Sequence, residues 1–332
     1  MRTMLPQPPR DASDPGDPGG DPAPRPRAAE PGDAAAACVA LAYRPPLDWD
    51  WMLAFLRLRS IGAVEAAGDA RAYRRTLRVA DARGTAHRGW LEIRADSGRA
   101  RRAPLSLRLS AGLLPVTGAV LARVRHALDL DCRPRQVAAA LGELARGREG
   151  LRLPQGFDGF EVAVRAILGQ QISVKAAHTL AGRIARRHGE PIDTPFAGID
   201  RVFPAPATIA AVDAAELAAL GIPRARAATI VALARAIRDG ALSLEPGAEV
   251  GETIATLKSF AGIGDWTAQY LAMRALGWSD AFPASDLGVM KALRVATPRA
   301  AELAAERWRP WRAYAVMHLW TPPPATAPRA PA

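Results

Sequence analysis

The period of hydrophobic and polar positions changes partway along the chain. In the first part, residues 73–80, 89–96 and 105–112 alternate apolar with polar side chains, which is the period of half-buried antiparallel strands. Residues 48–60 instead repeat apolar side chains at helical spacing, and Asp48 stands where a helix would take its N-terminal cap. These patterns predict a small α/β domain with an antiparallel sheet over residues 38–133.

The later part of the chain is patterned for helices. Stretches such as residues 159–189 and 224–240 repeat apolar side chains at helical spacing, and short turns rich in Pro, Gly and Asp separate them. The pattern predicts roughly eight helices and no strand. We therefore expect an all-α body over residues 134–325, and an α+β fold for the whole chain.

The two ends of the chain have a different composition. Residues 1–37 are about one-third Pro plus Gly and hold almost no large apolar side chains. Such a segment cannot bury enough surface to offset the entropy lost on ordering, so residues 1–37 and 326–332 are predicted to be disordered tails. The first tail carries six acidic residues against four arginines, which places the basic excess in the folded part.

Charge and cysteine content narrow the classes of function. The formal net charge is +11, which favours a polyanionic partner, with nucleic acid ahead of a membrane surface. The other explanation of this charge is a GC-rich genome, whose codons favour Arg and Ala. Cys38 and Cys132 lie far apart, a pattern that argues against a disulfide scaffold, a zinc site and a four-cysteine iron–sulfur cluster. No apolar run approaches the length of a membrane span, and the N-terminus has no apolar core of a signal peptide, so we expect a soluble cytoplasmic protein.

Residues 253–277 read as helix, tight turn, helix. Gly262 and Gly264 flank Ile263 in the turn, where glycine allows positive φ and a close approach of the backbone to a partner. The N–H groups at the start of the second helix would point outward and form an anion site. An ordinary helix–helix turn remains the alternative for this motif taken alone.

An acidic residue follows the hairpin. Asp286 stands between Pro283 and a new apolar helix, where an Asp most often caps the helix. A carboxylate fixed at a helix start is also well oriented to face a cleft, so capping and catalysis are compatible.

These motifs, together with "GLRLPQGFDGFEVAVRAILGQQIS" and "AERWRPWRAYAVMHLW", resemble the helix-hairpin-helix DNA glycosylases. The chain is most similar to the bacterial alkylbase glycosylases of the 3-methyladenine-DNA glycosylase II type, and the resemblance covers nearly all of residues 41–320. It implies a cleft between two helical subdomains and a monomeric enzyme that acts on double-stranded DNA, in association with the nucleoid. It implies no cofactor beyond a monovalent cation, which hairpin carbonyls would hold against a DNA phosphate.

The resemblance also implies roles for individual residues. Asp286 matches the catalytic aspartate, and Gly262, Ile263 and Gly264 match the hairpin that binds the DNA backbone. The aromatic pocket for the base is matched by Trp266, Tyr270, Trp320 and Phe55, and Arg59 is a weaker cleft candidate. For each aromatic residue, packing in the core is the alternative, and the remaining tryptophans considered are expected to be structural: Trp49, Trp51, Trp308 and Trp311.

Three positions separate this chain from its relatives or stay unexplained. Trp266 stands where strand-cutting glycosylases carry a lysine nucleophile, which implies base removal without cleavage of the strand. Gln171 stands where a close relative has the leucine wedge that fills the gap left by the flipped base. Asp265 puts a carboxylate beside a site meant for phosphate. A non-catalytic DNA-binding module is the other hypothesis for the chain, and a glycosylase with lyase activity is the third.

Overall fold

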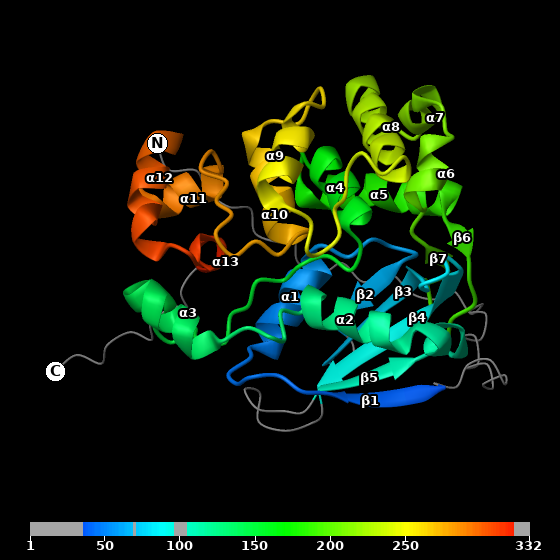
Figure 1. Ribbon diagram of the computed structural model, residues 1–332, viewed down its shortest axis with the longest axis horizontal. Helices are drawn as coiled ribbons and strands as arrows, with labels where there is room; N and C mark the ends of the chain where they lie inside the picture. The colour runs from blue at the N-terminus through cyan, green and yellow to red at the C-terminus, as the bar shows by residue number, and fades with distance from the viewer. Residues whose placement is uncertain (1–35, 69–70, 96–104, 322–332) are drawn as a thin grey trace, which may run out of the picture.

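The computed structural model describes residues 36–68, 71–95 and 105–321. Apart from its last two residues, the predicted tail over residues 1–37 lies outside these ranges, and so does the tail over residues 326–332. The described part combines a five-stranded sheet with helices that cover it and extend beyond it (Figure 1).

The sheet is antiparallel throughout, with the strand order β1-β5-β4-β3-β2. Its strands are β1 (Ala37–Leu41), β2 (Glu65–Ala67), β3 (Ala72–Ala80), β4 (Ala86–Ala95) and β5 (Leu105–Leu109). The three alternating segments of the sequence are β3, β4 and β5, so the predicted antiparallel sheet is confirmed. The sequence does not predict the edge strands β1 and β2, because β1 (ACVAL) lacks polar side chains that would alternate and β2 has only three residues.

Helices make up most of the remaining chain. They are α1 (Trp49–Leu58), α2 (Thr117–Ala127), α3 (Pro134–Leu141), α4 (Gly159–Leu168), α5 (Val174–His188), α6 (Pro206–Ala210), α7 (Ala214–Ala219), α8 (Arg224–Arg238), α9 (Val250–Lys258), α10 (Asp265–Arg274), α11 (Leu287–Leu293), α12 (Pro298–Ala305) and α13 (Arg312–Trp320), with 3₁₀ helices at Ala111–Val116, Gly142–Ala145 and Glu306–Trp308. The predicted cap of the first helix is present, because Asp48 Oδ1 accepts a hydrogen bond from Trp51 N at 2.9 Å.

The helical part differs from the sequence prediction in two details. Eleven α-helices follow residue 133 in the described chain, more than the roughly eight expected. Of these, α6, α7 and α11 have five to seven residues, too few for helical periodicity to separate them from their neighbours. The two-residue strands β6 (Glu190–Pro191) and β7 (Arg201–Val202) correct the expectation that no strand follows residue 134.

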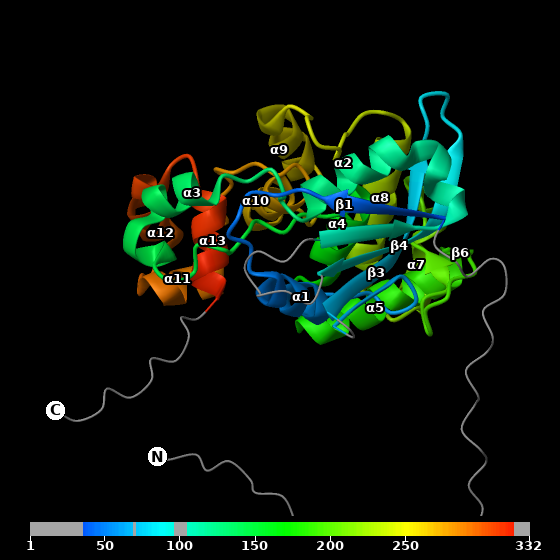
Figure 2. The ribbon, with the colours of Figure 1, turned by 90° about the horizontal axis from the view of Figure 1, so that it is seen from below.

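Three hydrophobic cores organise the molecule. The first lies between the sheet and helices α1 and α2. The second is enclosed by α4 to α10, and the third by α3 with α11, α12 and α13, which gather on one side of the molecule in Figure 2. The helical body therefore has two parts, as the resemblance implies. The boundary predicted at residues 133–134 stays a prediction, since Phe157 packs in the first core and Ile61 and Val64 pack in the second.

A buried cluster of charges joins the sheet to the helical body. Arg75 on β3 places Nη2 2.7 Å from Glu161 Oε2 on α4, and both side chains are 2% exposed. Arg165, one turn further along α4, bonds Glu65 Oε1 and Glu161 Oε1, each at 3.1 Å. Burial by itself raises the pKa of the Glu161 carboxyl, but Arg75 and Arg165 outweigh burial and hold this pKa below its ordinary value. The charges of the cluster are thus paired within it.

No helix among the described residues is long and apolar enough to cross a bilayer.

The buried cluster predicts a large effect of removing one partner. Arg75→Met leaves Glu161 with a buried charge and one partner fewer, so the free energy of unfolding should fall by roughly 3–5 kcal/mol. Urea denaturation followed by circular dichroism measures the change. Arg146→Met is the matched control, because it breaks the exposed ion pair with Glu143 and should have little effect. Equal stability of the two variants would contradict the prediction.

Candidate active site

The hairpin consists of α9, a turn over residues 259–264, and α10. Gly262 has φ +85°, as expected for a glycine in this turn. Gly264 differs from the expectation, because its φ of −89° and ψ of −178° are extended backbone that any residue adopts. An added Cβ at Gly264 would meet no atom within 4 Å, so the space beside this residue is open to an approaching partner.

The start of α10 presents uncapped N–H groups. Gly264 occupies the N-cap position and has no side chain that could accept a hydrogen bond from them. The first intrahelical bond of α10 runs from Ala268 N to Gly264 O at 3.0 Å, so the preceding N–H groups have no acceptor within the helix. By contrast, Asp158 and Asp286 cap α4 and α11 with their side chains. The hairpin turn therefore offers donors to an external anion.

Two side chains that the sequence analysis did not single out hold the turn in place. Gln170 donates from Nε2 to Gly262 O at 2.8 Å, and the same nitrogen lies 3.1 Å from Thr267 Oγ1. On the other side, the Thr229 hydroxyl lies 2.8 Å from Ala261 O. In the sequence, the only feature that could have pointed to Gln170 is its position in "ILGQQ", directly before the wedge candidate Gln171. Gln171 itself is exposed in this α4–α5 turn with φ +58°.

The Asp286 carboxylate is held by three N–H donors from three helices. Its Oδ1 accepts from Val289 N at 2.9 Å and from Trp320 Nε1 at 2.9 Å. Its Oδ2 accepts from Trp266 Nε1 at 3.0 Å. Asp286 is therefore the N-cap of α11 and at the same time the centre where α10, α11 and α13 meet. Gly288 makes room for this arrangement, since a Cβ there would lie 3.1 Å from Asp286 Oδ1.

Three aromatic rings form a wall beside the carboxylate. Trp266 and Tyr270, one turn apart on α10, are stacked with ring centroids 5.2 Å apart and planes at 15°. The centroid of Trp320 lies 6.4 Å from that of Tyr270. These rings line a cavity of about 470 Å³ together with Asp286, and Arg59, Arg165, Ile172 and His178 line it as well. The structure thus brings together Asp286 and three of the four predicted pocket aromatics.

Phe55, the fourth predicted pocket residue, does not line this cavity. The guanidinium carbon of Arg59 lies 3.7 Å from the centre of the Phe55 ring, and Arg59 lines the cavity instead. Arg59 is the C-cap residue of α1, one turn beyond Phe55, and its longer side chain folds back over the ring. Phe55 also packs against Trp51, with ring centroids 5.4 Å apart. Arg59 is therefore the better cleft candidate of the two.

The cavity has a mixed electrostatic character. Burial, only partly offset by the neighbouring Tyr270, lowers the pKa of Arg59 to about 10, so Arg59 keeps its charge at neutral pH. Burial and then the charges of Arg165 and Arg59 lower the pKa of His178 to about 4, which leaves its imidazole neutral. Burial raises the pKa of the Tyr270 phenol, but Arg274, Arg59 and Arg165 outweigh burial and bring it below its ordinary value.

Asp265 is explained by an ion pair. Its Oδ1 lies 3.1 Å from Lys258 Nζ on α9, the other helix of the hairpin. The pair keeps the Asp265 carboxylate engaged with a cation, and an acid in the first turn also suits the helix dipole. The four tryptophans expected to be structural lie outside the cavity lining, with Trp49 and Trp308 buried and Trp51 and Trp311 half-buried. No group of three or more His, Cys, Asp or Glu side chains in the described chain could hold a metal ion.

Two family models match adjacent parts of the chain. Residues 38–158 match the AlkA N-terminal domain, and residues 164–312 match the HhH-GPD superfamily of base excision DNA repair proteins.

Individual relatives match most of the chain. DNA-3-methyladenine glycosylase 2 of Escherichia coli (strain K12) is 41% identical over 280 residues, which cover 84% of this chain and 95% of that protein. A Mycobacterium tuberculosis (strain CDC 1551 / Oshkosh) protein named "Probable bifunctional transcriptional activator/DNA repair enzyme AlkA" is 37% identical over 291 residues, 85% of this chain but only 56% of its own length. Among solved structures, the 3-methyladenine DNA-glycosylase from Archaeoglobus fulgidus shares the fold, with a TM-score of 0.70 at 23% identity over 85% of this chain and 97% of that one.

The contacts of Gln170 predict a measurable loosening of the hairpin. Gln170→Ala removes the amide that bonds Gly262 O, and two lost hydrogen bonds cost about 1–3 kcal/mol. Local opening should therefore become about tenfold more frequent, seen as faster amide hydrogen exchange at Ile263, whose N–H bonds Phe260 O. Gln136→Ala on the exposed face of α3 is the control and should leave that exchange rate unchanged. An Ile263 exchange rate that is the same in both variants would show that Gln170 does not hold the turn.

Proposed function

The chain belongs to the HhH-GPD superfamily of base excision DNA repair proteins, and from that premise we propose that it is a monofunctional DNA glycosylase for alkylated bases. It flips bases such as 3-methyladenine and 7-methylguanine out of duplex DNA and hydrolyses their N-glycosidic bond, leaving an abasic site. Because its substrate is chromosomal DNA, we also propose that it acts in association with the nucleoid.

One observation carries this proposal: the Asp286 carboxylate sits at the edge of a cavity walled by Trp266, Tyr270 and Trp320, next to a hairpin whose N–H groups face outward. A plain DNA-binding module needs only the hairpin. It gives no reason for a carboxylate oriented by three donors inside an aromatic cavity.

The hairpin supplies the DNA contact. A phosphate of the lesion strand is bound by the uncapped N–H groups at the start of α10, where the helix dipole also favours negative charge. Glycine at residue 264 lets the phosphate approach the backbone, because no side chain stands in its way. We further propose that Gln171, exposed in the adjacent turn, enters the gap in the stack and bonds the orphaned partner base.

The cavity receives the flipped base. Unstacking costs a few kcal/mol and is least for damaged pairs, which contributes to selectivity. A purine alkylated on a ring nitrogen is positively charged, and each aromatic face stabilises such a cation by about 0.5–2 kcal/mol. The stacked pair Trp266 and Tyr270, with Trp320 beyond it, offers such faces.

The chemistry needs little besides the carboxylate. As the bond between C1′ and the base nitrogen breaks, its electron pair stays with the base, which leaves neutral and requires no general acid. Positive charge then develops on the sugar, and the adjacent Asp286 carboxylate stabilises it. A water molecule adds to C1′ from the carboxylate side and loses a proton, which passes by way of the Asp286 carboxylate to solvent, so that an abasic sugar remains.

The monovalent cation implied at the hairpin stays a prediction. Neutral carbonyl oxygens suit a singly charged ion, and the described residues hold no acidic cluster that would favour a divalent one. Ala261 O and Gly262 O each accept one hydrogen bond from the protein, which leaves each carbonyl a second lone pair for an ion.

The proposed role of Asp286 predicts a loss of activity at unchanged fold. Asp286→Asn keeps an N-cap residue for α11 but removes the negative charge, so single-turnover release of 3-methyladenine from methylated duplex DNA should fall about 10²–10³-fold. Asp213→Asn is the matched control, since Asp213 caps α7 through Ala215 N at 2.7 Å, and it should keep the wild-type rate. Full release by Asp286→Asn would refute the assignment, and no release by the wild-type protein would favour the non-catalytic DNA-binding module.

The indole at residue 266 predicts the absence of a covalent intermediate. A lyase forms a Schiff base through an amine, and Trp266 has none to offer. Borohydride added during base release should therefore trap no protein–DNA adduct, while alkali should cleave the product at the abasic site. A trapped adduct on a denaturing gel would instead identify the enzyme as a glycosylase with lyase activity.

A further inference from the structure

A second and larger cavity adjoins the candidate active site. It has a volume of about 930 Å³, lies between α1 and α5, and shares His178 with the aromatic cavity. Figure 2 shows α1 and α5 side by side along one edge of the molecule. We call this hollow the α1–α5 groove, defined by Arg57, Leu58, Ser60, Lys175, Thr179, Gly182, Arg183 and Arg186.

One face of α5 builds most of the groove. Lys175, Thr179, Gly182 and Arg186 follow one another at the spacing of successive helical turns, so they form a single stripe. The opposite face of α5 is buried in the core through Ala177, Ala181, Ile184 and Ala185. Gly182 is buried, but Lys175, Thr179 and Arg186 are exposed, so these three side chains lie on the outer surface of an amphipathic helix and are not part of its core.

The charge of the groove is entirely positive. Arg57, Lys175, Arg183 and Arg186 line it, no acidic side chain does, and none of these four forms an ion pair with a carboxylate of the described chain. Some exposed arginines elsewhere are paired, for example Arg238 with Asp239 and Arg299 with Glu302, and those without an ion pair, such as Arg83, do not line the groove. Four unpaired cations in one hollow repel one another, which is the arrangement expected of a site for an extended polyanion.

The dimensions of the groove fit a nucleic acid backbone. Lys175 and Arg186 are eleven residues apart on α5, or about 16 Å along the helix axis. One DNA strand advances about 3.4 Å per phosphate, so this stripe spans about four to five nucleotides. A flat bilayer cannot enter a hollow, whereas the ridge of phosphates along a duplex can.

We propose that the α1–α5 groove is a second binding surface for the sugar–phosphate backbone of duplex DNA, separate from the hairpin turn. The inference rests on the proposed function, because it takes DNA as the substrate. Since the groove and the aromatic cavity share His178, a duplex bound at the groove runs beside the cavity that receives the flipped nucleotide.

The test removes two charges of the stripe in the full chain. Lys175→Gln with Arg186→Gln should lower the affinity for undamaged duplex DNA roughly 10- to 100-fold at 0.1 M salt, measured by fluorescence anisotropy. The slope of log affinity against log salt should become shallower by about 2, since each phosphate contact contributes about 0.9. Lys175→Arg with Arg186→Lys keeps both charges and should keep the wild-type slope.

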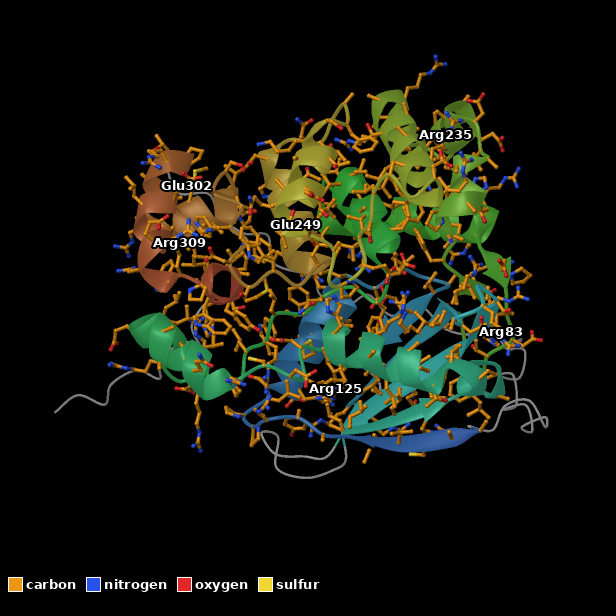
Figure 3. All side chains as sticks on the ribbon, in the orientation of Figure 1. Arg83, Arg125, Arg235, Glu249, Glu302 and Arg309 are labelled. Atoms are coloured by element: carbon orange, nitrogen blue, oxygen red, sulfur yellow. The ribbon has the colours of Figure 1, made fainter. Side chains whose placement is uncertain are left out.

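A matched pair of substitutions separates local contact from overall charge. Arg83→Gln with Arg146→Gln removes the same net charge at exposed positions in the β3–β4 turn and beside α3, with Arg83 labelled at the right of Figure 3. This control should retain wild-type affinity and slope. All variants should unfold at the same temperature as the wild-type protein, because the substituted side chains, Lys175 and Arg186 among them, are exposed.

Two results would overturn the proposal. The first is an affinity and slope of the groove variant equal to those of the Arg83 and Arg146 control. The second is wild-type affinity for duplex DNA combined with weakened binding of a polyglutamate peptide, which would assign the groove to an acidic protein. Base release by the wild-type enzyme is recorded on the same preparation, so failure of the proposed function is seen independently of the groove.

Discussion

The site depends on one constraint: the Asp286 carboxylate must receive three N–H donors at once. Val289 N belongs to α11, Trp266 to α10 and Trp320 to α13. Because α10 packs in both the second and the third core while α11 and α13 pack in the third, the carboxylate acquires its donors where these two cores meet. A carboxylate with both oxygens engaged has a fixed orientation, and such preorganisation is what electrostatic stabilisation of a transition state requires.

The part of the cavity wall formed by Arg165 and Arg59 is positioned by buried charges. Arg165 lines the cavity, yet its guanidinium bonds Glu65 on the sheet and Glu161 on its own helix, and it also donates to the backbone carbonyl of Arg59. Moving the sheet relative to α4 would therefore displace Arg165 and Arg59 together. An apolar interface of the same size would be at least as stable. In this position, however, the ion cluster fixes the register between two parts of the molecule that share a cavity wall.

The sequence predicted those features that depend on local patterns. Alternation identified β3, β4 and β5 because apolar and polar side chains alternate along them, and the Gly-X-Gly turn identified the hairpin because the following helix begins there. Asp286, Trp266, Tyr270 and Trp320 were found through resemblance, since nothing local shows that residues 20 or more positions apart will meet. Gln170 and Arg165 were missed for the same reason, as their partners Gly262 and Glu65 are distant in sequence. Phe55 was misplaced because periodicity gives the face of a helix but not which of two neighbouring side chains reaches further.

A protein that binds DNA and removes a cationic base must satisfy opposite electrostatic demands. The surface needs positive charge, which the net charge of +11 and the unpaired cations of the α1–α5 groove provide. The cavity, which takes a cationic base, must instead limit its own positive charge. There the Arg59 guanidinium stacks on the Phe55 ring and faces the Tyr270 phenol. Unit charges 4 Å apart interact by about 4 kcal/mol at an effective dielectric constant of 20, more than a single cation–π contact provides. Under the proposed function, Asp286 is therefore the one carboxylate of the described lining that would attract the cation, and it lies beside the aromatic rings. This separation of charge within one cavity lets a basic protein accept a positively charged base without giving up its affinity for the backbone.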